Sequence, residues 1–111
     1  MKNKMDEFPN LQFWEEAKKE WLNLDGHQKK YVSKALQRIE EKGAGIGDSL
    51  GKKRHIDLSG YRKVKLRKLG IRIVYKIVDG GIEITEIVAI GDREDEEVYR
   101  EAFERILKRE K

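Results

Sequence analysis

The stretch from Leu58 to Ile90 constrains the fold most, because three runs of β-favouring residues alternate there with two glycine-containing turns. In the first run apolar and basic residues alternate, as in a strand that has one buried face. The basic side of this strand consists of Lys63, Lys65 and Arg67. We therefore predict a small sheet with one strongly cationic face.

A hairpin turn at Leu69–Gly70 is predicted to join the first run to the second. This turn places Arg67 opposite Arg72. In the same register Lys63 lies opposite Lys76. The cations on this face repel one another, which indicates a polyanionic ligand.

Helical periodicity flanks the three runs. Apolar residues recur at helical spacing over residues 13–24, 28–42 and 94–108, and Gly43 is placed to end the second helix. Residues 8–13 can add a short edge strand, to which Pro9 is suited. The element order predicts an α+β domain: a small antiparallel β-sheet covered by an N-terminal helical hairpin, with a C-terminal helix.

Length and composition set the class of protein. The 111 residues fit a single domain over residues 1–111, with residues 1–7 expected to be disordered. The net charge is only +4, yet the basic residues concentrate between Lys52 and Lys76, which favours one anionic site over general coating. Because cysteines and long apolar runs are absent, we expect a cytoplasmic protein without a membrane partner.

Five side chains could carry chemistry on RNA. They are cationic or phenolic and fall on the predicted basic face or just beyond it: Lys63, Lys65, Arg72, Arg93 and Tyr99. A ribose 2′-hydroxyl can attack the adjacent phosphate if a base takes its proton and cations stabilise the phosphorane. Arginine binds two nonbridging oxygens, and a crowded lysine has a lowered pKa that suits a base. This chemistry needs no metal or other cofactor, and we predict none.

A second group of basic residues lies around these five and is predicted to bind RNA: Lys52, Lys53, Arg54, Arg67 and Lys76. Simpler interpretations stay open. Basic residues on a strand are often an ordinary solvated face, Tyr99 has helical spacing to Phe103 and can be a core residue, and Arg93 can pair with a nearby glutamate.

The chain resembles the RelE toxins of the RelE/ParE superfamily. The resemblance rests on E-W-x-x-L at residues 20–24, K-x-K-L-R at 63–67, G-x-R-x-V-Y at 70–75 and G-x-R-E-x-x-x-V-Y-x-x-A at 91–102, followed by R-I-L at 105–107. It covers roughly residues 13–108 and implies a small β-sheet with two N-terminal helices.

The resemblance also implies an activity. Proteins of the RelE branch are toxins that cleave mRNA in the ribosomal A site, so it implies the ribosome with its rRNA, mRNA and a cognate antitoxin as partners. The family's sheet lysines correspond to Lys63 and Lys65, its arginines to Arg72 and Arg93, and its C-terminal tyrosine to Tyr99. We expect Lys63 or Tyr99 to activate the 2′-hydroxyl. Lys65 and Arg93 would then stabilise the phosphorane and the leaving group, while Arg72 holds the phosphate.

Two alternatives have other mechanisms. A ParE-like gyrase inhibitor would use the same scaffold for binding without RNA cleavage. A non-toxic nucleic-acid-binding regulatory domain would use the basic face without arresting growth. The full phosphate-cleaving set favours the nuclease.

Overall fold

The computed structural model describes residues 11–53, 56–78, 84–92 and 97–109. The strands are β1 (Leu11–Phe13), β2 (Asp48–Ser49), β3 (Lys52–Lys53), β4 (Ile56–Asp57), β5 (Tyr61–Leu66), β6 (Ile71–Val78) and β7 (Ile84–Asp92). The helices are α1 (Glu15–Asn23), α2 (Gly26–Lys42) and α3 (Glu97–Arg109), with a short 3-10 helix at Ala44–Ile46. The predicted α+β class and helix order are confirmed, while residues 1–7 lie outside the described ranges.

Five of the strands form one sheet in the order β1–β7–β6–β5–β2. The three long strands β5, β6 and β7 pair antiparallel, as predicted. The short edge strand β1 instead runs parallel to β7, so the sheet is mixed. The two helices α1 and α2 return the chain to the end of the sheet at which β1 begins, so β5 runs in the same direction as β1. After the two antiparallel connections β5–β6 and β6–β7, β7 has this direction as well. Strands β3 and β4 form a separate two-stranded ladder.

The predicted register of the β5–β6 hairpin is wrong by two residues. The loop occupies residues 67–70 rather than Leu69–Gly70 alone, and Leu66 is opposite Ile71. Gly70 adopts a left-handed φ of 67°, which a glycine tolerates without strain, and two turn hydrogen bonds close the loop. Because the slip is an even number of residues, every strand side chain keeps its predicted face.

The new register changes the neighbours of the basic residues. Lys65 is opposite Arg72, and Lys63 is opposite Val74. Lys76 is opposite Tyr61, and Arg67 lies in the loop rather than on the strand. The cationic face therefore concentrates near the loop end of the hairpin.

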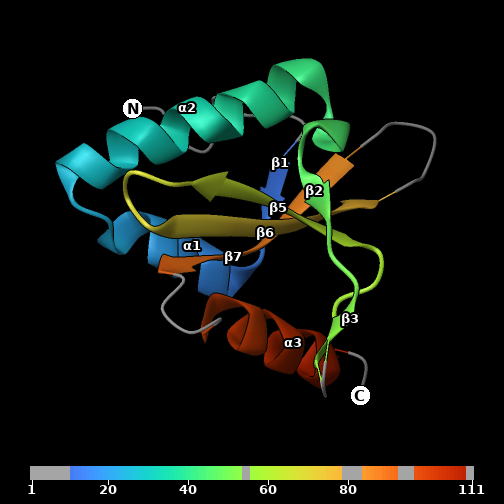
Figure 1. The fold of residues 1–111 in the computed structure, drawn as a ribbon. Coiled ribbons are helices and arrows are strands. Elements are labelled where there is room, and N and C mark those ends of the chain that lie inside the picture. The colour runs from blue at the N-terminus through green and yellow to red at the C-terminus, as the bar shows by residue number, and fades with distance from the viewer. Residues whose placement is uncertain (1–10, 54–55, 79–83, 93–96, 110–111) are drawn as a thin grey trace.

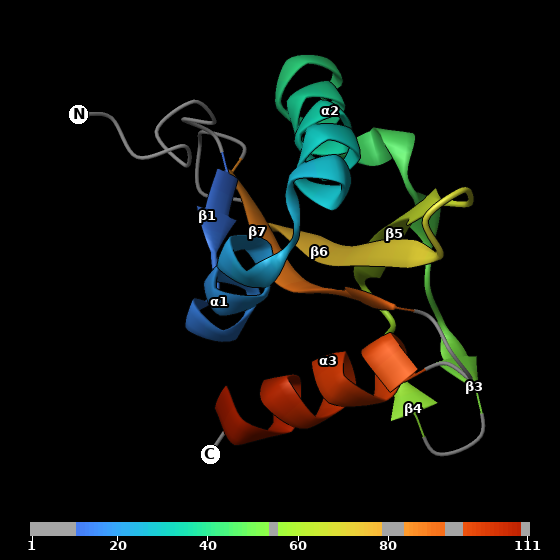
Figure 2. The same cartoon turned by 90° about the vertical axis from the view of Figure 1, so that its left-hand side faces the viewer.

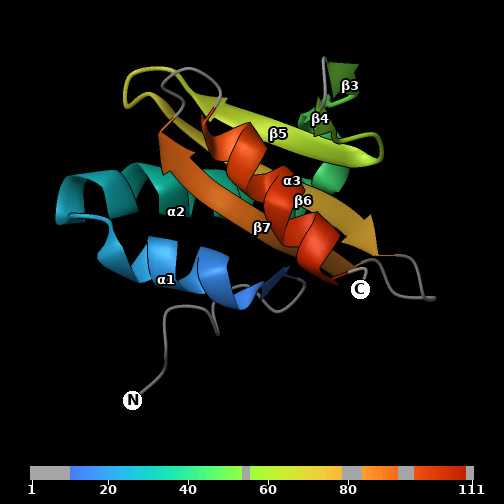
Figure 3. The ribbon, with the colours of Figure 1, turned by 90° about the horizontal axis from the view of Figure 1, so that it is seen from below.

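The helices lie on both faces of the sheet. Figures 1 and 2 show α2 above one face and α3 below the other, with α1 beside β1 and β7. Figure 3 shows α3 crossing β7 and β6 from below. Asp25 caps α2: its side chain accepts a 2.7 Å hydrogen bond from the Gln28 N–H, and the Gln28 side chain accepts one from the Asp25 N–H.

Apolar side chains from both layers fill the core. The two tryptophans predicted to be packing residues, Trp14 and Trp21, are buried. The largest fully buried side chains of β6 and β7 are Ile71, Ile73, Val74, Tyr75, Ile87, Val88 and Ile90. Burial of neighbouring residues on these strands means that both faces of the sheet are covered. Within the described ranges, no helix has the length and apolar character needed to cross a membrane.

Glu20 and Arg105 complete the edge of β7 beyond the end of β1. The Glu20 carboxylate accepts a 3.0 Å hydrogen bond from the Ile90 N–H, and the Arg105 guanidinium donates a 2.9 Å bond to the Val88 carbonyl. The two side chains also pair with each other through bonds of 2.9 and 2.7 Å. This network fixes α1 and α3 to the same strand.

Candidate RNA-cleaving site

Three of the five predicted site residues lie together on the sheet face that α3 covers. Lys65 of β5 is directly opposite Arg72 of β6, and Lys63 lies two residues along β5 on the same face. Gly91 of β7 flanks Arg72 on its other side. A Cβ on Gly91 would be 3.6 Å from Val98 of α3, so the helix packs directly over this part of β7.

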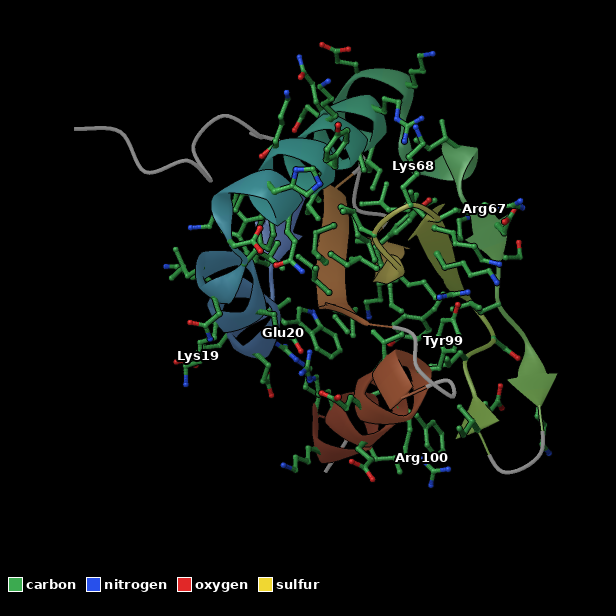
Figure 4. All side chains as sticks on the ribbon, turned by 60° about the vertical axis from the view of Figure 1, so that its left-hand side comes forward. Lys19, Glu20, Arg67, Lys68, Tyr99 and Arg100 are labelled. Carbon is green, nitrogen blue, oxygen red and sulfur yellow. The ribbon has the colours of Figure 1, made fainter. Side chains whose placement is uncertain are left out.

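Tyr99 reaches this cluster from α3. Its ring lies beneath the Lys63 ammonium, with Nζ 5.6 Å from the ring centroid. Figure 4 shows Tyr99 extending toward the sheet, whereas Arg100, the next residue of the helix, points away from it. The structure therefore brings Lys63, Lys65, Arg72 and Tyr99 together from three elements.

The cluster contains two buried polar groups without a partner. Among the described residues, neither the Tyr99 hydroxyl nor Arg72 Nε forms a hydrogen bond. An unsatisfied buried group of this kind costs roughly 1–3 kcal/mol. Such groups in a folded protein call for an explanation, and a ligand-binding role is one.

Crowding of positive charge changes the proton affinity of one lysine. The charge of Lys63 and, to a smaller extent, that of Arg72 lower the pKa of Lys65 below the ordinary value for lysine. Asp48, which is opposite Lys63 at the β2–β5 edge, acts weakly in the other direction. The exposed Lys65 amine is thus neutral at a lower pH than an isolated lysine.

No carboxylate among the described residues pairs with the cluster. Within that part of the chain, Lys63, Lys65 and Arg72 form no ion pair, unlike Arg105, which pairs with Glu20 and Glu101. An unneutralised group of cations on a sheet face attracts a polyanion. This separates the cluster from an ordinary salt-bridged surface.

The loop before β5 is anchored beside the cluster. The Arg62 guanidinium donates a 2.8 Å hydrogen bond to the Gly47 carbonyl, and the buried Tyr75 hydroxyl bonds to the Gly47 backbone. Burial raises the pKa of Tyr75, so this phenol stays protonated and acts as an anchor. A Cβ on Gly47 would overlap the Tyr75 hydroxyl, which explains the glycine.

The remaining predicted RNA-binding residues are dispersed. Lys52 lies in the β3–β4 ladder near the start of α3, and Lys76 lies at the far end of β6 with Nζ 5.7 Å from the Tyr61 ring. Arg67 is exposed in the hairpin loop. Arg93 and Arg54, together with the side chain of Lys53, are outside what the structure describes.

Sequence reasoning assigned no role to Glu20 and Arg105. Their only signal was their place in the E-W-x-x-L and R-I-L motifs, which were used for the resemblance alone. They lie 85 residues apart, so no local pattern links them. In the structure they set the position of α3, the helix that carries Tyr99.

Known toxins resemble this chain in both sequence and fold. Residues 11–97 match the family model described as the ParE toxin of the type II toxin–antitoxin system parDE. The Escherichia coli K12 protein named mRNA interferase toxin RelE is 33% identical over 97 residues, covering 87% of this chain and 96% of the relative. The chain belongs to the RelE/ParE family of toxins.

Solved structures of RelE proteins share this fold. The free form of an E. coli RelE variant with two arginines replaced by alanine is 32% identical, with a TM-score of 0.66 over 86% of this chain and 95% of the other. The intact E. coli RelBE toxin–antitoxin complex contains a chain that is 28% identical, with a TM-score of 0.55 over 74% of this chain and 93% of the other. The expected RelE-type fold is therefore confirmed.

Proposed function

We propose that this RelE-type protein is the toxin of a type II toxin–antitoxin module and that it inhibits translation by cleaving mRNA. The observation that carries the proposal is the group formed by Lys63, Lys65 and Arg72 on one sheet face, with Tyr99 over it. The relatives named mRNA interferase support the same activity. Two unsatisfied polar atoms in the cluster give an incoming phosphate or ribose groups to bind.

The reaction follows from the positions of these groups. The two lysines here exchange the roles expected from the resemblance, because the crowded amine is that of Lys65 and not that of Lys63. The neutral Lys65 amine takes the proton of the ribose 2′-hydroxyl, because its lowered pKa suits a base better than that of an ordinary lysine. The 2′-oxygen attacks the adjacent phosphorus, forming a bond as the bond to the 5′-oxygen breaks. The departing 5′-oxygen accepts a proton from the Lys63 ammonium. The products are a 2′,3′-cyclic phosphate and a 5′-hydroxyl, and no metal is required.

Arg72 and Tyr99 position the substrate in this proposal. The Arg72 guanidinium binds nonbridging oxygens of the scissile phosphate, where negative charge develops in the phosphorane. The Tyr99 hydroxyl orients the 2′-hydroxyl once it exchanges its buried, unpartnered state for that hydrogen bond. Arg93, two residues beyond Gly91, is proposed to approach the same phosphate.

The ribosome is proposed as the partner that presents the message. An open cationic face attracts any RNA but does not fix a flexible strand in an attack geometry, and orientation of the reactants supplies a large part of catalysis. A codon held in the ribosomal A site meets this need. An antitoxin is the second proposed partner, because a RelE relative has been solved with its antitoxin RelB.

A gyrase inhibitor is the second candidate, since the matching family model is described as a ParE toxin. Binding alone does not require a lysine with a lowered pKa beside a phosphate-binding arginine. The unneutralised cluster therefore favours cleavage.

Mapping of mRNA ends on translating ribosomes tests the proposal. Wild-type protein is expected to produce new 5′ ends within A-site codons, with 2′,3′-cyclic phosphate on the upstream fragments. Arg72→Ala should abolish these ends, and Arg100→Ala, which alters an exposed arginine facing away from the sheet, should preserve them. Inhibition of DNA supercoiling without new mRNA ends would refute cleavage and establish the gyrase alternative.

A further inference from the structure

A hollow lies between the first turns of α2 and the β5–β6 hairpin. Its volume is about 340 Å³, within the range of ligand pockets. Aromatic and aliphatic side chains form its interior, and we call it the α2 pocket, defined by His27, Tyr31, Leu66 and Leu69. Lys65, Arg67 and Lys68 complete its lining along the hairpin.

Tyr31 is the aromatic surface of the α2 pocket. Its side chain is 38% exposed, and the His27 ring meets it edge-on with centroids 5.1 Å apart. The ammonium groups of Lys30 and Lys34 are 5.9 and 5.5 Å from the Tyr31 ring centroid, near the outer limit of a cation–π contact. A base stacked on the Tyr31 ring can replace these weak contacts. Both ammonium groups then remain beside the base.

A stripe of cations continues from Tyr31 along α2. Lys30, Lys34, Arg38 and Lys42 recur every four residues, and all four are exposed. Four residues of helix advance about 6 Å, so the stripe presents one positive charge per 6 Å. Like charges at this spacing destabilise a helix unless an anion binds them. Glu41, at the edge of the stripe, accepts a hydrogen bond from Gln37.

The β5–β6 hairpin forms the side of the α2 pocket that lies opposite α2. Figure 4 shows Arg67 and Lys68 on the α2 side of the molecule, away from Tyr99. Two further hollows follow the stripe, one bordered by Lys34 and Arg38 and the other by Arg38 and Lys42. The second hollow also reaches Lys63 and Lys65 on β5. The α2 pocket is thus the apolar end of a cation-lined surface.

This surface adjoins the candidate cleavage site, because Lys65 belongs to the cationic cluster and also lines the α2 pocket. The two aromatic rings nevertheless belong to opposite layers: α3, which carries Tyr99, covers one face of the sheet, and α2, which carries Tyr31, covers the other (Figure 2). We therefore assign to the α2 pocket a different base from the nucleotide attacked beside Arg72.

We propose that the α2 pocket binds an unpaired base of ribosomal RNA, stacked on Tyr31, with the flanking phosphates on the α2 stripe. Single-stranded RNA is recognised in this way, by aromatic stacking combined with cations that follow the backbone. An acidic peptide could pair with the cations, whereas a nucleic acid strand supplies both regularly spaced phosphates for the stripe and a planar base for the exposed ring. The inference rests on the proposed ribosomal function and adds the surface that docks the toxin.

The test measures affinity for small ribosomal subunits lacking message, in an Arg72→Ala background that prevents cleavage and leaves the lining of the α2 pocket intact. Tyr31→Ala should weaken binding about 5- to 150-fold, the loss expected for one stacked base. Tyr31→Phe keeps the ring and should bind within about twofold of its parent. Lys34→Glu combined with Arg38→Glu should flatten the salt dependence, whereas Lys18→Glu with Lys19→Glu on α1 should not.

Each of the other outcomes contradicts one part of the proposal. Parental affinity of Tyr31→Ala, with its fold verified by circular dichroism, overturns the pocket while wild-type mRNA cleavage still upholds the proposed function. A change confined to codon preference assigns the base to the message, and a loss confined to antitoxin binding assigns the surface to a protein; both overturn the ribosomal assignment. Absence of any binding or cleavage by wild-type protein overturns the proposed function as well.

Discussion

Replacing Arg105 with alanine removes the side chain that fixes α3 to the sheet. Arg105 donates to both Glu20 carboxylate oxygens and to the Val88 carbonyl, and its side chain is only 13% exposed. Hydrogen bonding with Glu20 raises the pKa of Arg105, in keeping with a pair that stabilises the charged form. The truncation leaves the Glu20 carboxylate with one recorded partner, the Ile90 N–H.

The cost can be bounded from these contacts. Hydrogen bonds to charged groups contribute roughly 1.5–3 kcal/mol, and removing one partner of a fully buried ion pair costs roughly 3–5 kcal/mol. Glu20 is 25% exposed, so water recovers part of that loss. We expect Arg105→Ala to lower the free energy of unfolding by about 2–4 kcal/mol. For a domain of this size that lowers Tm by roughly 10–25 °C.

Urea and thermal unfolding followed by circular dichroism measure this loss of unfolding free energy. The measurements use a Lys65→Ala background, because a protein that does not cleave mRNA can be expressed without arresting growth. Arg100→Ala, an exposed arginine on the same helix, is the matched control and should change stability by less than about 0.5 kcal/mol. Combining Arg105→Ala with Glu20→Gln should cost less than the sum of the two changes, because they break one interaction. If Arg105→Ala is as stable as Arg100→Ala, the network does not fix α3.

Three further predictions concern the site and its support. Gly47→Ala should lower the free energy of unfolding by about 1–3 kcal/mol in urea titrations, because its Cβ overlaps the Tyr75 hydroxyl. The double variant with Tyr75→Phe should lose less stability than the sum of the losses of the two single variants. Lys63→Gln should slow cleavage and move the rising limb of the pH–rate profile to higher pH, since it removes the main cause of the lowered pKa of Lys65. A rising limb at the wild-type pH would rule out Lys65 as the base. Tyr99→Phe should keep its Tm within a few degrees, because the hydroxyl has no hydrogen-bond partner among the described residues, while single-turnover cleavage falls by roughly 10²-fold, the loss expected when a reactant is misplaced. Unfolding of this variant would instead favour a packing role for Tyr99.

Side-chain periodicity predicted the faces of the sheet but not its register. Alternation in β5 is unchanged by a two-residue slip, so it could not distinguish Arg67 from Lys65 as the neighbour of Arg72. The left-handed conformation of Gly70 and the turn hydrogen bonds decide the register. The parallel pairing of β1 is likewise beyond a three-residue pattern.

Contacts between distant segments were the least predictable part of the site. The charge pattern selected Lys63, Lys65 and Arg72 together because they share one hairpin. The Glu20–Arg105 pair and the α2 pocket each join segments whose proximity depends on the complete fold. The roles given to Arg93 and Arg54 stay predictions, since both residues lie outside the described ranges.

Single-turnover cleavage of message on programmed ribosomes tests the central claim most directly. Lys65→Ala and Arg72→Ala, each verified as folded, should lose cleavage by orders of magnitude, while the exposed-site controls Lys19→Ala and Arg100→Ala should keep wild-type rates. Wild-type rates in Lys65→Ala and Arg72→Ala would contradict the assignment of RNA cleavage to this face of the sheet.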